Sequence, residues 1–319
     1  MQFISSESFR LSIIIPTKNR VKLLTQLLES IKQLDGVDEV RLDVIVADND
    51  SDDGTYGYVS SMVGAFPAAI RILKVRRPGK SAAINDAVKS ATGDVLAFLD
   101  DDVTVDKTWL TAVGDFFRNQ EYRVGQGVIR LPSPESDDPE LLRLVERFRT
   151  IPRLEHEPHL KTLHSLNGAN FFVARDLFDR LGGFDERLGP GASGTSEDVD
   201  FARRLAGARI AIGYAPQAIV YHRVDNNRLT EAYFRQSHRR QGASRFLIRR
   251  HGTAVIFLNL ARAAAQFGYY TVRRRERERY RSKGRIYHYL GMLEAKQNGV
   301  QRPQARKTEN AMDRPSLHP

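Results

Sequence analysis

The stretch VLAFLDDD, residues 95–102, joins five apolar residues to three consecutive aspartates. A short, continuous apolar run of this kind is typical of a strand that is buried on both faces of a sheet. Adjacent carboxylates repel one another, so they need a cation or hydrogen-bond donors nearby. Mg²⁺ and Mn²⁺ accept carboxylate oxygens and commonly share their ligands with substrate phosphates. The stretch therefore favours a buried strand that ends in a metal-binding turn, although aspartates can also cap a helix.

Alternating strand and helix patterns precede this stretch. Apolar runs predict strands at 11–15, 42–47 and 70–75, and helical patterns predict helices at 21–33 and 81–90. Strands separated by helices at this pitch are typical of a parallel sheet covered on both faces. The predicted fold class is therefore α/β, with a Rossmann-like, mostly parallel central sheet flanked by helices.

Polar segments follow three of the predicted strands. They are PTKNR at 16–20, DND at 48–50 and the aspartates at 100–102. In open α/β sheets, ligands bind at the carboxyl ends of the strands. The three segments therefore predict one binding site along one edge of the sheet.

The second half of the chain has weaker periodicity. A helix predicted at 198–206 follows a glycine-rich segment, so its start carries the carboxylates of Glu197 and Asp198. Acidic residues are also favoured at a helix start by the helix dipole alone. His222 ends a series of short strand pieces at 210–222, and it is either structural or part of a metal site.

The composition excludes several classes of protein. The chain has 319 residues, of which 41% are hydrophobic and 28% charged, as in ordinary globular domains. It has no cysteine, which rules out disulfides, thiolate metal sites and cysteine nucleophiles and fits a reducing compartment. Residues 1–10 include Glu7 and Arg10 and no long apolar run, so we expect no secretory signal and a cytoplasmic location.

The positive charge is concentrated near the C-terminus. Residues 235–285 contain 15 Lys and Arg against 2 Glu, a local charge of +13 in a chain whose net charge is +10, which leaves −3 elsewhere. A basic segment of this kind attracts polyanions such as an anionic membrane, nucleic acid or a phosphorylated lipid.

The most apolar part of the basic segment is 253–272. Asn259, Arg262 and Gln266 interrupt it on one helical stripe, and a charge at the centre of a spanning helix costs roughly 3 kcal/mol. An amphipathic helix in the surface of an anionic membrane is therefore favoured over a spanning helix, with a helix packed on the protein as the alternative. We expect peripheral association with the inner face of the plasma membrane, no nucleic-acid partner, and a disordered tail at 298–319.

The order and spacing of the motifs resemble those of the family 2 glycosyltransferases, which have the GT-A fold, over about residues 11–240. The resemblance rests on SIIIPTKNR (12–20), VIVADNDS (44–51), LDDD (99–102), LGGFDE (181–186) and EDVD (197–200). It implies a GT-A domain at 1–229, with a nucleotide-sugar half at about 9–130 and an acceptor half at about 131–229. A basic, amphipathic helical extension would follow at 230–297.

The resemblance also implies roles for single residues. Asp198 matches the family's catalytic base, while Glu197, Gly168 and Ala169 are expected to border the acceptor. Asp102, Asp100 and His222 are expected to hold Mn²⁺ or Mg²⁺. Either Asp48 or Asn49 is expected to contact the base of the nucleotide, and Lys80 either contacts phosphate or is only solvated. The residues expected to bind the nucleotide sugar are Pro16, Thr17, Asn19, Arg20, Asp48, Asn49, Lys80, Asp100 and Asp101.

The reaction that the resemblance implies is an inverting transfer of a sugar from a nucleoside diphosphate to an acceptor hydroxyl. Asp198 would accept the hydroxyl proton, a contribution of roughly 10²–10⁴ in rate. Processive synthases of the family carry a Gln-x-x-Arg-Trp motif and several spanning helices, but QSHRR at 236–240 has no tryptophan. A single addition is therefore favoured, and the basic tail suggests a lipid-linked or cell-envelope glycan as the acceptor.

Two other functions share some of these features. A nucleotidyltransferase usually has a glycine-rich phosphate loop after its first strand, whereas PTKNR at 16–20 has no glycine. A non-catalytic binding module could use the basic tail to bind nucleic acid, but it would not need Asp102, Asp198 and His222 together. Release of pyrophosphate would indicate the first alternative, and salt-sensitive binding to DNA but not to anionic liposomes the second.

Overall fold

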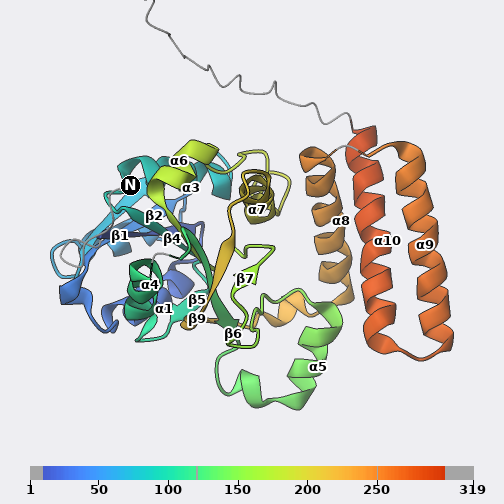
Figure 1. Cartoon of the computed structure of the whole chain (residues 1–319), viewed down its shortest axis with the longest axis horizontal. Coiled ribbons are helices and arrows are strands. Elements are labelled where there is room, and N and C mark those ends of the chain that lie inside the picture. The colour runs from blue at the N-terminus through green and yellow to red at the C-terminus, as the bar shows by residue number, and fades with distance from the viewer. Residues whose placement is uncertain (1–9, 120, 250, 299–319) are drawn as a thin grey trace, which may run out of the picture.

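The computed structural model describes residues 10–119, 121–249 and 251–298. Within these ranges the chain forms a nine-stranded sheet with helices packed on it, followed by a layer of three long helices (Figure 1). The strands are β1 Arg10–Thr17, β2 Arg41–Asp48, β3 Ala69–Lys74, β4 Val95–Leu99, β5 Val103–Val105, β6 Val124–Arg130, β7 Thr162–Leu163, β8 Asn170–Ala174 and β9 Ile212–His222. The helices are α1 Val21–Lys32, α2 Thr55–Ser61, α3 Lys80–Ser90, α4 Trp109–Arg118, α5 Pro139–Phe148, α6 Arg175–Leu181, α7 Glu197–Gly207, α8 Glu231–Ile248, α9 Thr253–Val272 and α10 Glu276–Gln297. Three short 3₁₀ turns are η1 Val37–Glu39, η2 Glu135–Asp137 and η3 Asn226–Arg228.

The strand order in the sheet is β3-β2-β1-β4-β8-β6-β9-β5, with β7 beside β9. Strands β1 to β4 run parallel to their neighbours among themselves, as do β6 and β9, while β8 is antiparallel to both β4 and β6. The predicted α/β class with a mostly parallel sheet is confirmed. The four strands predicted before residue 100 correspond to β1, β2, β3 and β4.

The buried central strands explain why these segments fold as they do. Strand β4 is buried at every position, and β1 and β2 are buried at all positions after the first, as expected for strands covered on both faces. Helix α1 buries Leu24, Leu27, Leu28 and Ile31, a spacing that forms one apolar stripe against the sheet.

Strand β9 differs from the series of short pieces predicted at 210–222, because it is one continuous strand. Its register against β6 shifts between Ala215, which is opposite Gly127, and Ile219, which is opposite Val128. Pro216 lies in this irregular part, where its missing N–H does not interrupt the ladder. No prediction was made from sequence for β5, α4 or β6.

The C-terminal extension is helical, with α10 packed between α8 and α9 (Figure 1). Gly242 of α8 and Gly291 of α10 make the contact close: an added Cβ would lie 1.9 Å from the His288 carbonyl oxygen and 2.0 Å from that of Arg239, respectively. No larger residue fits at these two positions without separating the helices.

Helix α9 confirms the helix predicted at 253–272 but places its polar residues differently. The Gln266 Oε1 accepts a hydrogen bond of 3.0 Å from Arg285 of α10, and Asn259 is partly buried. The large apolar side chains that α9 exposes are Val255, Phe257, Leu258, Tyr269 and Val272. Among the described residues, no helix has the length and hydropathy needed to cross a bilayer. The predictions for residues 1–9 and 299–319 lie outside the described ranges.

Asn170 of β8 joins four elements through its side-chain amide. Its Oδ1 accepts a bond of 2.9 Å from Trp109 Nε1, and its Nδ2 donates to the carbonyl oxygens of Val128 and Ala218, both at 2.8 Å. We expect Asn170→Leu to lower the free energy of unfolding by at least about 3 kcal/mol, because it leaves three buried polar groups without partners. Urea denaturation checks this, with the exposed Asn119→Ala as a control expected to change stability by less than about 0.5 kcal/mol. A loss below about 1 kcal/mol for Asn170→Leu would show that these bonds contribute little.

Candidate active site

The aspartates that follow β4 lie against the end of β1, and Asp101 makes the connection. Its carboxylate accepts hydrogen bonds from Thr17 Oγ1 at 2.7 Å and from Arg20 Nη1 at 2.8 Å. Burial raises the pKa of Asp101 to about 6, although the Arg20 guanidinium opposes the rise. The structure thus brings together three residues that the sequence analysis assigned to the nucleotide sugar.

Asp102 is buried and lies beside His222 at the end of β9. The distance from Asp102 Oδ1 to His222 Nε2 is 3.3 Å, and Nδ1 of His222 lies 2.8 Å from the carbonyl oxygen of Arg223. A carbonyl oxygen cannot donate, so Nδ1 carries the hydrogen and Nε2 of a neutral ring faces the carboxylate as a second acceptor. Two acceptors that face each other need a cation or a proton between them. Arg20 and Arg228 lie 3.3 and 3.2 Å from the Asp102 Oδ2.

The residues at this place fit a divalent metal only in part. Over the described ranges, no three His, Cys, Asp or Glu side chains lie close enough to hold a metal by themselves. Asp102 and His222 nevertheless offer an oxygen and a nitrogen ligand, and the backbone bond to Nδ1 orients the ring as in metal-binding histidines. Mg²⁺ and Mn²⁺ commonly complete such a partial site with water and substrate phosphates. Asp100 is directed elsewhere, because it pairs with Lys80.

Lys80, at the start of α3, connects the aspartates to the start of α7. Its Nζ lies 2.5 Å from Asp100 Oδ1 and 3.2 Å from Glu197 Oε1. Burial would lower the pKa of Lys80, but the two carboxylates raise it above its ordinary value. Lys80 is therefore charged and is not the solvated lysine that the sequence left as an alternative.

Asp198 lies in the first turn of α7 and accepts two backbone hydrogen bonds, from Gly168 N at 2.9 Å and from Val199 N at 2.7 Å. Burial and the charge of Glu197 raise the pKa of Asp198 to about 7, while Lys80 and the two N–H groups oppose the rise. A carboxylate with a pKa near neutral pH is suited to general-base catalysis.

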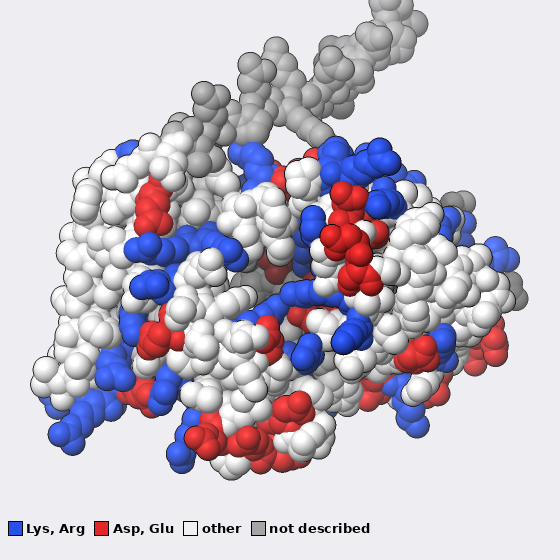
Figure 2. Space-filling view, turned by 180° about the vertical axis from the view of Figure 1, so that it is seen from behind, with Lys and Arg blue, Asp and Glu red and all other residues white. Residues whose placement is uncertain are grey.

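A cavity of about 310 Å³ joins these groups, and we call it the acceptor cavity after the role that the resemblance implies for Gly168 and Glu197. Its wall contains Lys80, Asp100, Asn167, Gly168, Glu197 and Asp198 from the sheet domain, and Tyr233, Gln236, Arg240 and Gln241 from α8. Figure 2 shows a hollow between the sheet domain and the helical layer, with acidic atoms inside and basic atoms around it. Asp100, which follows β4, and the two carboxylates at the start of α7 therefore share one cavity.

Two of the three residues expected to border the acceptor, Gly168 and Glu197, line this cavity. An added Cβ on Gly168 would lie 3.2 Å from Lys80 Nζ and 3.8 Å from Asp198 Oδ2, which places this glycine among the charged groups. Glu197 is buried and also lines the cavity. Ala169 does not, because its side chain is fully buried in the hydrophobic core. We therefore assign no acceptor contact to Ala169.

The structure distinguishes Asp48 from Asn49 at the end of β2. Asn49 uses its amide internally, since Nδ2 donates to the carbonyl oxygens of Val75 and Arg77 and Oδ1 accepts from Gly79 N. Asp48 accepts one bond from Ser51 N, and its buried Oδ2 has no partner among the residues that the structure describes. Asp48 is therefore the residue of the two whose side chain has an unpaired oxygen.

The loop after β1 is held against the loop after β2. Asn19 has a positive φ of 53° and donates its N–H to Ser51 Oγ at 2.9 Å, while its Oδ1 accepts from Asp52 N at the same distance. Pro16 lies opposite Ala47 in the pairing of β1 with β2. Asn19 and Pro16 thus shape the edge of the site through the backbone.

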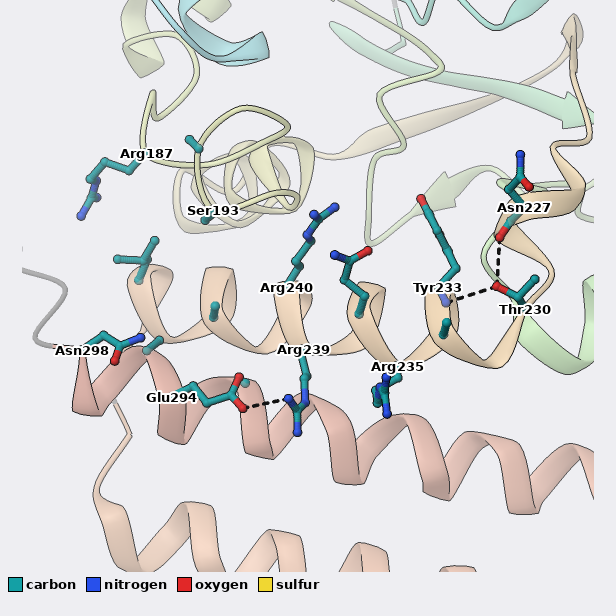
Figure 3. A pocket seen from close by; sticks show the side chains of 17 residues that line it. Arg187, Ser193, Asn227, Thr230, Tyr233, Arg235, Arg239, Arg240, Glu294 and Asn298 are labelled. Carbon is teal, nitrogen blue, oxygen red and sulfur yellow. Dashed lines mark hydrogen bonds and ion pairs between the residues drawn. The ribbon is translucent and has the colours of Figure 1, made fainter.

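Helix α8 forms the far wall of the acceptor cavity and also borders a larger groove of about 1020 Å³. In Figure 3, Arg240 projects from α8 toward the coil that carries Ser193, whereas Arg239 points toward α10 and pairs with Glu294. Tyr233, Gln236 and Arg240 line both the cavity and the groove, so the two adjoin.

Sequence reasoning did not identify the arginines around the site. Arg228 contacts Asp102 across 126 positions of sequence, and Arg149 and Arg240 reach the acceptor cavity from α5 and α8. Arg149 and Arg228 belong to no motif and lie outside the basic segment at 235–285, whereas Arg240 lies within it. The excess of positive charge in that segment could have pointed to Arg240 alone.

The fold and the site define an α/β protein with a carboxylate-rich site at the ends of its parallel strands. The family model for glycosyl transferase family 2 matches residues 12–182, more than half of the chain. This chain belongs to that family and is a glycosyltransferase, as the resemblance predicted.

Several characterised relatives are similar over most of the chain. The succinoglycan biosynthesis protein ExoM of Rhizobium meliloti is 29% identical over 267 residues, which cover 83% of this chain and 84% of ExoM. The glycosyltransferase AglE of Haloferax volcanii is 22% identical over 66% of each chain.

Solved structures share the fold at low sequence identity. The mannosyltransferase PcManGT from Pyrobaculum calidifontis, in complex with GDP-Man and Mn²⁺, has a TM-score of 0.53 and 18% identity, covering 93% of this chain and 77% of that one. S. aureus TarS 1-349 in complex with UDP-GlcNAc has a TM-score of 0.54 and 17% identity, covering 91% and 92%. The predicted GT-A fold is confirmed.

Proposed function

We propose that this glycosyltransferase moves a sugar from a nucleoside diphosphate to an acceptor hydroxyl with inversion at the anomeric carbon, in a single addition. One observation carries the proposal: Asp198, with its raised pKa, shares a cavity with Lys80 and with Asp100, which lies at the end of the strand that leads to Asp102. A base and the groups that hold a departing diphosphate must lie on opposite sides of the same sugar. The donors bound by PcManGT and TarS, GDP-Man and UDP-GlcNAc, support a nucleotide-sugar donor here.

The donor half of the site follows from the strand ends. The unpartnered oxygen of Asp48 can accept an N–H from the base of the nucleotide, and Arg20 and Arg228 can donate to its phosphates. Asp102 and His222 would hold Mn²⁺ or Mg²⁺, which would neutralise charge on the departing diphosphate. Asp100, oriented by Lys80, is suited to accept a hydrogen bond from a hydroxyl of the ribose or of the donor sugar.

Asp198 acts on the acceptor. It accepts the proton of the attacking hydroxyl, whose oxygen forms the bond to C1 while the bond to the diphosphate oxygen breaks on the opposite face. Gly168 N and Val199 N hold the carboxylate in place, so little of its orientational freedom remains to be lost on reaching the transition state. Glu197 keeps Asp198 basic through its charge, and Lys80 balances the pair.

The pH dependence should follow Asp198. Because its pKa is raised to about 7, the unprotonated form that can act as a base disappears as the pH falls below that value. We expect kcat/KM for the acceptor to fall about tenfold per pH unit below about pH 6.5 and to level off above about pH 8. Lys80 lowers the pKa of Asp198, so Lys80→Met should shift the fall in kcat/KM to higher pH. If kcat/KM of Lys80→Met fell over the same pH range as that of the parent protein, the assignment of Asp198 as the base would be contradicted.

The acceptor that fits is a glycan longer than one sugar, because the acceptor cavity adjoins the groove of about 1020 Å³ along α8. The name of ExoM, a succinoglycan biosynthesis protein, supports a cell-envelope or lipid-linked glycan. Helix α9 supports a position at an anionic membrane on the cytoplasmic side, since its apolar outer face is followed by Arg273, Arg274 and Arg275. Figure 2 shows a mostly uncharged strip along its left edge, where α9 lies.

A donor screen tests the proposal. The purified full chain is incubated with Mn²⁺ and a panel of UDP-, GDP- and dTDP-sugars, and the released nucleotide is measured. Release of a nucleoside diphosphate from one of them is expected. Release of pyrophosphate, as from a nucleotidyltransferase, or no release from any donor would contradict it.

A further inference from the structure

We propose that a cavity lined by arginines, next to the acceptor cavity, binds a phosphate or diphosphate group that is part of the acceptor. The inference rests on the proposed function and adds the chemical class of the acceptor, a glycan whose sugar is attached through phosphate. The cavity has a volume of about 620 Å³ and lies between the end of α5, α8 and α10. We call it the basic cavity.

The wall of the basic cavity is positively charged. Among the described residues that line it are four arginines and two histidines, and none is an aspartate or glutamate. Burial lowers the pKa of both His238 and His288, the latter to about 4, so the arginines supply the charge at neutral pH. The titratable side chains of the wall other than Tyr280 and Tyr289 are Arg147, Arg149, His238, Arg281, Arg285 and His288.

Among the described residues, one of the four arginines has an acidic partner. Arg147 pairs with Glu276 at 2.7 Å, and Arg285 donates to the neutral Gln266. Arg149 and Arg281 have no ion pair or side-chain hydrogen bond within the part of the chain that the structure describes. Partial burial, together with the charges of Arg281 and Arg277, lowers the pKa of Arg149. Like charges that lie this close repel one another, and a bound anion relieves the repulsion.

Arg149 connects the basic cavity to the site of the reaction. It lines both the basic cavity and the acceptor cavity, as does Gln241 of α8. Its backbone is left-handed, with φ of 54° at the end of α5, a conformation that is unfavourable for a non-glycine residue. The chain keeps an arginine in this unfavourable conformation where it faces both cavities.

The chemistry of the wall selects phosphate. A guanidinium donates two parallel hydrogen bonds to phosphate oxygens, and such charge-assisted bonds are stronger than neutral ones. The donor's phosphates are assigned to Arg20, Arg228 and Asp102, none of which lines the basic cavity. A phosphate in the basic cavity therefore belongs to the second substrate, with the attacking sugar beside Asp198.

A binding experiment tests the cavity directly. Inorganic pyrophosphate is titrated into the full chain by calorimetry in buffer with EDTA. The double variant Arg149→Gln/Arg281→Gln should weaken pyrophosphate binding at least about tenfold. The control Arg180→Gln, which removes the same kind of charge from the exposed face of α6, should change it less than about twofold. Full binding in the double variant, with loss in Arg20→Gln/Arg228→Gln, would place the pyrophosphate in the donor site and overturn the inference.

A transfer experiment separates this inference from the proposed function. Two acceptors with the same sugar are compared, one carrying a diphosphate and one a hydroxyl in its place, each with and without a short prenyl chain. In the parent protein, KM for the diphosphate acceptor should be at least about tenfold lower than KM for the hydroxyl acceptor. In the double variant the two KM values should become nearly equal. A preference for the diphosphate without the chain indicates a soluble source of phosphate, and a preference only with it a lipid source; either supports the inference.

The failures are also distinguishable. If no donor releases a nucleoside diphosphate, the proposed function itself fails. If the parent protein transfers sugar but uses both acceptors equally, only the phosphate assignment fails. Equal use of both acceptors, with loss of binding to phosphatidylglycerol vesicles in the double variant, would show that the arginines bind membrane headgroups and would likewise overturn the inference.

Discussion

Asp198→Asn is expected to lower kcat by about 10²–10⁴ while donor affinity changes less than about threefold. The amide retains the shape of the side chain and can still accept the N–H of Gly168, but it cannot take the proton of an attacking hydroxyl. The donor contacts assigned to Asp48, Arg20 and Asp102 are not altered. Rapid-quench or steady-state transfer assays, with calorimetry of the nucleoside diphosphate, measure both quantities.

The control for this prediction is Asp179→Asn, the same change at an exposed position of α6. It should leave both kcat and donor affinity unchanged. If Asp198→Asn kept nearly full turnover, a different group would have to accept the proton. If it lost nucleotide affinity to the same extent as turnover, Asp198 would belong to the donor site instead.

Asp102→Asn is expected to lower kcat/KM for the donor by about 10²–10³ and to weaken Mn²⁺ binding at least about tenfold. The substitution removes the charged oxygen that faces Nε2 of His222 at 3.3 Å. His222→Gln should act in the same way, and the double variant should lose little more than either single variant, because the two groups act as a unit. Electron paramagnetic resonance of Mn²⁺ in the presence of nucleoside diphosphate measures the binding.

Two outcomes would contradict the metal assignment. One is full activity of the parent protein after removal of divalent ions with EDTA. The other is Mn²⁺ affinity in Asp102→Asn equal to that of the exposed control Asp179→Asn. In either case the contact between Asp102 and His222 would be a simple ion pair, and Arg20 and Arg228 would have to balance the diphosphate alone.

The part of the fold that could be predicted is the part where local pattern and burial agree. Strands β1, β2 and β4 have apolar, buried central residues because they are covered on both faces, and the polar residues that follow them mark the edge where ligands bind. This reasoning placed Asp101 near Thr17 and Arg20, and the motif order identified the family.

The part that could not be predicted depends on how distant segments meet. Strand β6 contains Gly125 and Gly127, which weaken its pattern, and an added Cβ on Gly127 would lie 2.2 Å from Asn170 Nδ2. That contact exists only after β6 and β8 have paired, so no local rule reveals it. In the same way, Asp48 and Asn49 are adjacent in sequence. Only the packing of residues 75–79 shows that the side-chain amide of Asn49 is already hydrogen-bonded within the protein.

The most direct test of the central claim, that Asp198 acts on the face of the sugar opposite the departing diphosphate, is the anomeric configuration of the product. The disaccharide formed from a donor of known configuration is examined by proton NMR, using the coupling constant of its new anomeric hydrogen. The account predicts the configuration opposite to that of the donor, so an α-linked nucleotide sugar gives a β-linked product. A product that retains the donor's configuration would contradict it.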